Sequence, residues 1–106
     1  MLEHPTIADI RHAQQRLKPH IRHTPLLRAE KLEKAVGCQL YLKPETLQIT
    51  GAFKIRGALN KTLSLPREQI ARGIIATSSG NHAQGLAYAA RMLGVKAILV
   101  LPVTTP

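Results

Sequence analysis

The sequence has little of several residue types that point to particular classes of protein. Its 106 residues include one cysteine, Cys38, no tryptophan and three aromatic side chains. A single cysteine excludes an internal disulfide and a zinc site made of cysteines alone. No apolar run approaches the roughly 18 residues that a membrane-spanning helix needs. We therefore expect a cytoplasmic protein that does not enter a membrane.

Acidic residues are also scarce, above all in the second half of the chain. The sequence has 15 Lys and Arg against 6 Asp and Glu, a formal charge of +9. Residues 1–50 hold 8 basic and 5 acidic side chains, whereas residues 51–106 hold 7 and 1. The second half should therefore attract anions. A small phosphate or carboxylate fits this charge, and nucleic acid is not the expected partner because aromatic stacking platforms are few.

Four stretches combine apolar residues at helical spacing with residues that begin or stop a helix. Thr6 is a good N-cap, and Gly37 and Gly94 are typical stops. The predicted helices cover residues 7–18, 30–36, 52–65 and 81–93, with one further turn at 67–71.

The remaining apolar runs predict strands. Leu26-Leu27 and Gln39 to Lys43 indicate short extended pieces, and residues 73–77 and 97–101 indicate buried strands on either side of the last helix. A strand, a helix and a strand at this spacing form a βαβ unit, whose two strands are parallel. The predicted fold class is α/β, with parallel strands and flanking helices.

A parallel sheet normally has both faces covered, and the βαβ unit supplies one crossover helix. The last predicted strand runs into Pro102 to Pro106 with no further helix after it. The sequence therefore looks cut short.

The segment Thr50 to Ala58 places Lys54 in the opening turn of a predicted helix. The unpaired N–H groups of that turn carry partial positive charge, which disfavours an ammonium and helps to free the amine for Schiff-base chemistry. On residue type alone, a solvated surface lysine is the commoner case.

The segment Ser78 to His82 joins the end of a predicted strand to the start of a helix. Free backbone N–H groups converge there beside two hydroxyls, as in an anion cradle at the carboxyl edge of a sheet. Gly80 would let a ligand approach the backbone closely, and Asn81 can donate or accept a hydrogen bond. A Ser or Asn N-cap without any ligand explains the same residues.

Two other features have structural interpretations. His20 and His23 lie three positions apart, but no second pair stands at ligand spacing, so no metal site is expected. Cys38 is expected to be a small buried residue at the start of a strand.

Taken together, the lysine segment and the Ser-Ser-Gly-Asn-His segment, in this order, resemble the fold-type-II pyridoxal-phosphate enzymes. The closest resemblance is to the threonine/serine ammonia-lyases (threonine dehydratases) with serine racemase. It extends over essentially the whole chain, beginning near Thr6 to Ile10 and passing through His23 to Leu26 and Tyr41 to Glu45. The sequence departs from the family pattern at Ala52, where the family usually has Ser.

The resemblance implies pyridoxal 5'-phosphate as cofactor and a part of the tryptophan synthase β-like fold. Lys54 would hold the cofactor as a Schiff base and remove the α-proton of the substrate, with Phe53 beside it. Asn81 would hydrogen-bond the phenolic oxygen of the cofactor. The loop that receives the substrate carboxylate would consist of Ser78, Ser79, Gly80, Asn81 and His82. Ser79 would lie on the far side of the cofactor from Lys54.

The implied reaction converts L-threonine or L-serine to a 2-oxo acid and ammonia, in a full-length enzyme that forms a homo-oligomer. The family's phosphate-binding loop would lie beyond Pro106. The resemblance therefore implies that residues 1–106 are an incomplete N-terminal part of the catalytic domain, which should show little activity alone. A serine racemase, with Ser79 as the reprotonating acid, or a β-replacing or threonine-synthase-type enzyme is the alternative within the same fold. A basic noncatalytic module that binds polyanions or pairs with a missing half is the alternative from another class.

Overall fold

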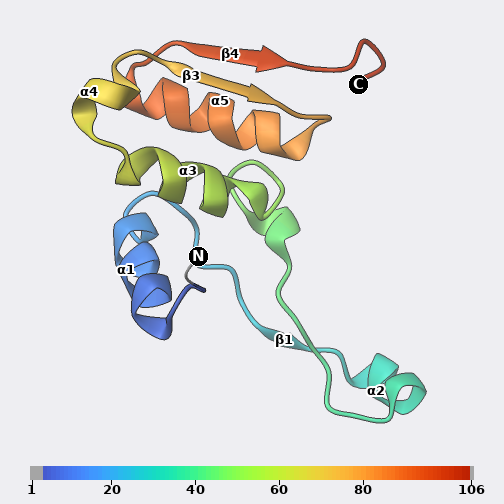
Figure 1. The fold of residues 1–106 in the computed structure, drawn as a ribbon. Coiled ribbons are helices and arrows are strands. Elements are labelled where there is room, and N and C mark those ends of the chain that lie inside the picture. Colours follow the sequence, from blue (N-terminus) through green and yellow to red (C-terminus); the bar gives the residue numbers. More distant parts are fainter. Residues whose placement is uncertain (1–3, 106) are drawn as a thin grey trace.

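The computed structural model describes residues 4–105 and stacks their main elements in layers (Figure 1). A two-stranded sheet forms the outermost layer. Helix α5 packs beneath the sheet, α3 packs against α5, and α1 packs against the far side of α3. The layers, in this order, are β3 (Ile74–Thr77) with β4 (Ala97–Val100), α5 (Asn81–Leu93), α3 (Lys54–Ser64) and α1 (Ile7–Leu17).

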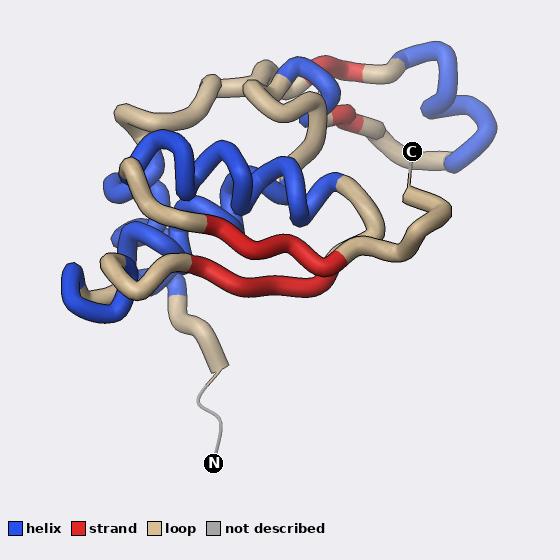
Figure 2. The backbone as a smooth tube through the Cα atoms, turned by 90° about the horizontal axis from the view of Figure 1, so that it is seen from above, coloured by secondary structure: helices blue, strands red, loops and turns tan. Residues whose placement is uncertain are grey.

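The segment between α1 and α3 forms an arm that extends away from these layers (Figures 1 and 2). Two short antiparallel strands make its stem, with Leu27 opposite Leu42, and a helix connects them. The elements of the arm are β1 (Leu27–Arg28), α2 (Glu30–Val36) and β2 (Tyr41–Leu42). The short helix η1 (Glu45–Leu47) then leads the chain back toward α3.

The predicted βαβ unit is confirmed. β3 and β4 are parallel, with Ile74 opposite Ala97 and Thr77 opposite Val100. Burial alternates along both strands because only one face of the sheet rests on α5. On the other face, Ile75 is 73% exposed.

The predicted helix ends also agree with the structure. Thr6 caps α1 through a reciprocal pair of hydrogen bonds with Asp9. Helices α2 and α5 stop at Gly37 (φ 71°) and Gly94 (φ 66°), in a left-handed conformation that a glycine adopts without strain. The helix expected over residues 52–65 starts two residues later, at Lys54, and the turn after Pro66 is α4 (Arg67–Ile70).

The expectation for Cys38 is wrong. The residue is exposed and lies in the turn after α2, before the strand begins. The strand itself is two residues long, where five had been expected. Both differences have one cause: the arm stands away from the layers, so nothing buries Cys38 or extends the pairing.

The core lies where α1, α3 and α5 meet. Leu17, Ile55, Leu59 and Ala89 form its buried centre. Between α3 and α5 the approach is close, because an added Cβ at Gly85 would lie 3.1 Å from Ala58 Cβ and 3.3 Å from the Ile55 backbone. None of the helices within residues 4–105 is long and apolar enough to cross a membrane.

Two helical glycines test how much the fold depends on this close approach. Gly57 in α3 has no atom within 4 Å of an added Cβ, so Gly57→Ala should raise the free energy of unfolding by up to about 1 kcal/mol. Gly85→Ala forces the two helices apart, and overpacking typically costs about 1–3 kcal/mol. Urea unfolding should therefore show Gly85→Ala to be less stable than Gly57→Ala by about that amount. Equal stabilisation by both substitutions would contradict the close packing.

Candidate active site

Lys54 is the first residue of α3 and its side chain is exposed. Its ammonium nitrogen lies 5.3 Å from the centre of the Phe53 ring, a separation that allows a cation–π contact. Among residues 4–105 it has no hydrogen-bond or ion-pair partner. The amine is therefore held near Phe53 by a weak contact and is accessible to a reagent from solution.

The Ser78 to Gly80 turn follows β3 directly and precedes α5, as predicted. The Ser78 N–H donates to Val100 O and extends the parallel ladder. The Ser78 hydroxyl oxygen accepts hydrogen bonds from the N–H groups of Gly80, at 3.1 Å, and Ala83, at 3.0 Å. Ser78 thus shapes the turn and accepts a hydrogen bond from the first turn of α5. The N-cap residue itself is Gly80, so the Ser or Asn N-cap that the segment offered as an alternative is not present.

The rest of this turn keeps its hydrogen-bonding groups uncommitted. No acceptor within residues 4–105 meets the backbone N–H groups of Ser79, Asn81 or His82, and the side chains of Ser79 and Asn81 are exposed. The space beside Gly80 is open, since an added Cβ there would meet no atom within 4 Å. These N–H groups stand at the positive end of a 13-residue helix, an arrangement that binds anions.

Helices α3 and α5 run side by side in the same direction, and both begin at the end of the molecule to which β3 and β4 point (Figure 1). Gly85 lies one turn into α5 and touches Ile55, the residue after Lys54. The first turns of the two helices are therefore neighbours. The structure brings the elements that carry Lys54 and Asn81 together at the carboxyl edge of the sheet, where ligands of α/β proteins bind.

An ion pair that the sequence does not predict joins the first turn of α3 to η1. Arg56 Nε donates to Glu45 Oε2 at 2.8 Å, and Arg56 Nη2 donates to Glu45 Oε1 at 2.7 Å. The Thr24 hydroxyl donates to the same Glu45 Oε1 at 2.6 Å. Hydrogen bonds from Arg56, and to a smaller extent from Thr24, lower the pKa of Glu45 from 4.5 to about 2, although burial opposes this shift.

The buried side-chain amide of Gln48 also holds the segment before α3 in place. Gln48 is 2% exposed, and its side chain binds both backbone groups of Arg22, each at 2.9 Å. Glu45 and Gln48 lie eleven and eight residues before Arg56, and no single helix or strand contains all three residues. The sequence shows that charged and amide side chains are present here, but no pattern in it indicates which of them form pairs.

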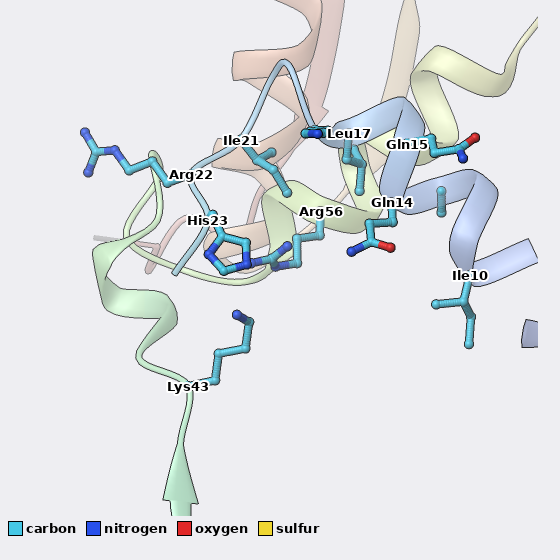
Figure 3. Close-up of a pocket in the computed structure, with 11 residues that line it drawn as sticks. Ile10, Gln14, Gln15, Leu17, Ile21, Arg22, His23, Lys43 and Arg56 are labelled. Atoms are coloured by element: carbon cyan, nitrogen blue, oxygen red, sulfur yellow. The ribbon is translucent and has the colours of Figure 1, made fainter. Parts of the chain in front are cut away.

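A cavity of about 680 Å³ lies outside the predicted site, between α1 and the segments that carry His23 and Lys43 (Figure 3). Ile10, Ala13 and Leu17 of α1 give it an apolar wall, and Arg56 also borders it. None of the predicted site residues lines this cavity. The shared contact of Lys54 and Asn81 with one cofactor, which the resemblance implies, therefore stays a prediction.

The donor set at the two helix starts fits pyridoxal phosphate at its aldehyde end. An exposed primary amine, an exposed amide and uncommitted N–H groups are the groups that an aldehyde, a phenolic oxygen and a carboxylate require. The Thr50 hydroxyl, four residues before Lys54, is buried without a hydrogen-bond partner among residues 4–105. No group of three or more potential metal ligands occurs within the same residues.

Comparison with known proteins gives consistent results. Residues 17–106 match the family model described as pyridoxal-phosphate dependent enzyme. The chain is 47% identical over 97 residues to the L-threonine ammonia-lyase of Geobacter sulfurreducens, covering 92% of this chain and 24% of that protein.

Solved structures agree with the sequence matches. Maize serine racemase superimposes with a TM-score of 0.87 at 42% identity, over 94% of this chain and 30% of that one. A threonine deaminase from T.th. does so with a TM-score of 0.80 at 50% identity, over 93% and 34%. The chain thus spans about a quarter to a third of the length of these relatives.

The lowered pKa of Glu45 predicts how stability depends on acid. The ionised carboxylate stabilises the fold fully above pH 4.5, and this contribution is lost as the pH falls toward 2. The loss should be at most about 3 kcal/mol. Urea unfolding between pH 7 and pH 2 should show a smaller acid loss in Glu45→Gln than in the parent chain. Glu68→Gln, which removes an exposed carboxylate of α4, should keep the parental loss; identical curves for all three would refute the ion pair.

Proposed function

The chain belongs to the family of pyridoxal-phosphate dependent enzymes and has part of the fold-type-II structure. We propose that it carries the lysine-bearing part of the active site of a threonine or serine ammonia-lyase. The observation that carries this proposal is the side-by-side start of α3 and α5 at the carboxyl edge of the sheet. One start supplies Lys54 and the other supplies Ser78 to His82.

Each residue of the two starts has a role in this proposal. Lys54 Nζ holds the cofactor and takes the proton from Cα of the substrate. Asn81 holds the phenolic oxygen of the cofactor through its exposed amide, and Phe53 packs beside the lysine. When bound, pyridoxal phosphate supplies a ring that withdraws the electrons left at Cα.

The start of α5 is the proposed site for the substrate carboxylate. The free N–H groups of Ser79, Asn81 and His82 can donate to its oxygens, and the open side of Gly80 leaves room for them. Ser78 contributes by holding the turn in shape, because its hydroxyl oxygen already accepts two N–H groups. The relatives named L-threonine ammonia-lyase and threonine deaminase support a small amino acid with a β-hydroxyl leaving group as the substrate class.

Residues 1–106 are, in this proposal, an N-terminal part of the catalytic domain, in keeping with their cover of a quarter to a third of the relatives. Holding the reactants in the correct orientation can lower a reaction barrier by about 7–11 kcal/mol. The resemblance puts the phosphate-binding loop outside these residues, so we expect the 106-residue chain to release little ammonia on its own.

A racemase is the second candidate, because the Ser79 side chain is exposed and a serine racemase is among the similar structures. Its hydroxyl would return a proton to Cα on the face opposite Lys54. The two candidates differ in product, since the racemase yields the D-amino acid and the lyase yields ammonia and a 2-oxo acid.

A chimaera tests the proposal with the residues of this chain in place. Residues 1–106 replace the matching part of the Geobacter sulfurreducens L-threonine ammonia-lyase, to which they are 47% identical. The chimaera should release ammonia from L-threonine, and Lys54→Ala should reduce kcat by about 10²-fold or more. Lys61→Ala, on an exposed lysine of the same helix, is the matched control and should keep the parental rate.

Two results would count against the proposal. The first is a Lys54→Ala chimaera as active as its parent. The second is a chimaera that binds pyridoxal phosphate yet forms neither ammonia nor the D-amino acid from threonine or serine.

A further inference from the structure

We propose that Arg56 and Glu45 are positioning residues for Lys54, and that their ion pair sets the face of α3 from which Lys54 presents its amine. This inference rests on the proposed function, since it gives Lys54 an orientation that matters only if the amine reacts. It assigns a role to two residues that touch neither the helix start of α5 nor the Lys54 amine within the described structure.

The position of Arg56 on α3 makes the role geometrically direct. Arg56 follows Lys54 by two residues, and two residues of an α-helix turn through about 200°. The two side chains therefore leave the first turn of α3 on nearly opposite sides. A force that holds Arg56 in one direction consequently holds Lys54 in the other.

The ion pair can resist rotation of the helix because it has two points of attachment. Two guanidinium nitrogens of Arg56 meet the two carboxylate oxygens of Glu45 separately, at 2.7 and 2.8 Å. Such a fork fixes direction as well as distance, which a lysine in the same place cannot do.

The carboxylate is itself anchored to a different part of the chain. Thr24, which is 2% exposed, donates its hydroxyl to Glu45 at 2.6 Å, and its carbonyl accepts a hydrogen bond from Lys43 at 2.8 Å. Gln48 adds the bonds to Arg22. The segment that leads into α3 is therefore tied on both sides of residues 49–53, which carry the chain to Lys54.

The ion pair adds to the packing of α3 against α5. Ile55 and Ala58 pack against Gly85 and set both the distance between the helices and the buried face of α3. Arg56 is not one of these packed residues, so its ion pair adds a directional restraint at another side of the first turn. Arg56 borders the cavity that His23 also lines (Figure 3). The side chains of Arg56 and Glu45 are 31% and 16% exposed, so the pair is partly shielded from water.

The test measures where pyridoxal phosphate attaches to this chain, without any need for turnover. The chimaera with the Geobacter sulfurreducens L-threonine ammonia-lyase is incubated with the cofactor and reduced with sodium borohydride, and mass spectrometry gives the ratio of label on Lys54 to label on Lys61. Both lysines are exposed and belong to α3, so each corrects for the other. The parent chain should label Lys54 preferentially.

Three variants separate positioning from stability. Arg56→Met and Arg56→Lys should lower the Lys54 to Lys61 ratio about tenfold, within the roughly 10²-fold that a misplacement of 1 Å costs in catalysis. Glu45→Arg combined with Arg56→Glu reverses the pair and should restore much of the ratio. All variants are labelled at a temperature at which circular dichroism shows each one folded, so a simple loss of fold does not change the ratio.

The outcomes distinguish the two claims. Equal labelling of Lys54 and Lys61 in the parent chain would overturn the proposed function, and the positioning role with it. Preferential labelling in the parent that persists unchanged in Arg56→Lys and Arg56→Met would overturn the positioning role alone. So would a reversed pair that labels no better than Arg56→Met.

Discussion

The close packing of α3 against α5 is the contact on which the site depends. Without a side chain at Gly85, the two helices approach until backbone and Cβ atoms are nearly in contact. Because the helices run in the same direction, this contact near their first turns also aligns their starts. The helix starts that carry Lys54 and Asn81 are then brought to the same end of the molecule. The chemistry proposed for the chain follows from this alignment.

Apolar packing and polar bonds stabilise different parts of the structure around this contact. Apolar packing of Leu17, Ile55, Leu59 and Ala89 supplies the layered order of the helices. Polar bonds of Glu45, Gln48 and Thr24 hold the irregular segment that enters α3. The outer face of the sheet, with Ile75 exposed, and the arm around α2 take no part in either. The segment that enters α3 is thus held by several polar bonds, whereas the outer face of the sheet is apolar and is not covered by the described residues.

Much of the fold was predictable because its signals are local. Thr6, Gly37 and Gly94 fix helix ends through their own backbone or side chain, and the apolar runs around α5 predict parallel strands. What could not be predicted depends on contacts distant in sequence. The pairing of Glu45 with Arg56 and the use of the Ser78 hydroxyl in the turn are examples. Cys38 was misplaced for the same reason, since its burial depends on whether the arm packs on anything.

The central claim is that Lys54 and Asn81 serve one bound cofactor. The most direct measurement is a crystal structure of the protein after pyridoxal phosphate has been reduced onto it with borohydride. The account predicts density joining the cofactor to Lys54 Nζ, with its phenolic oxygen within hydrogen-bond distance of the Asn81 amide. A cofactor joined to Lys54 but turned away from the start of α5, or one joined to another lysine, would contradict it.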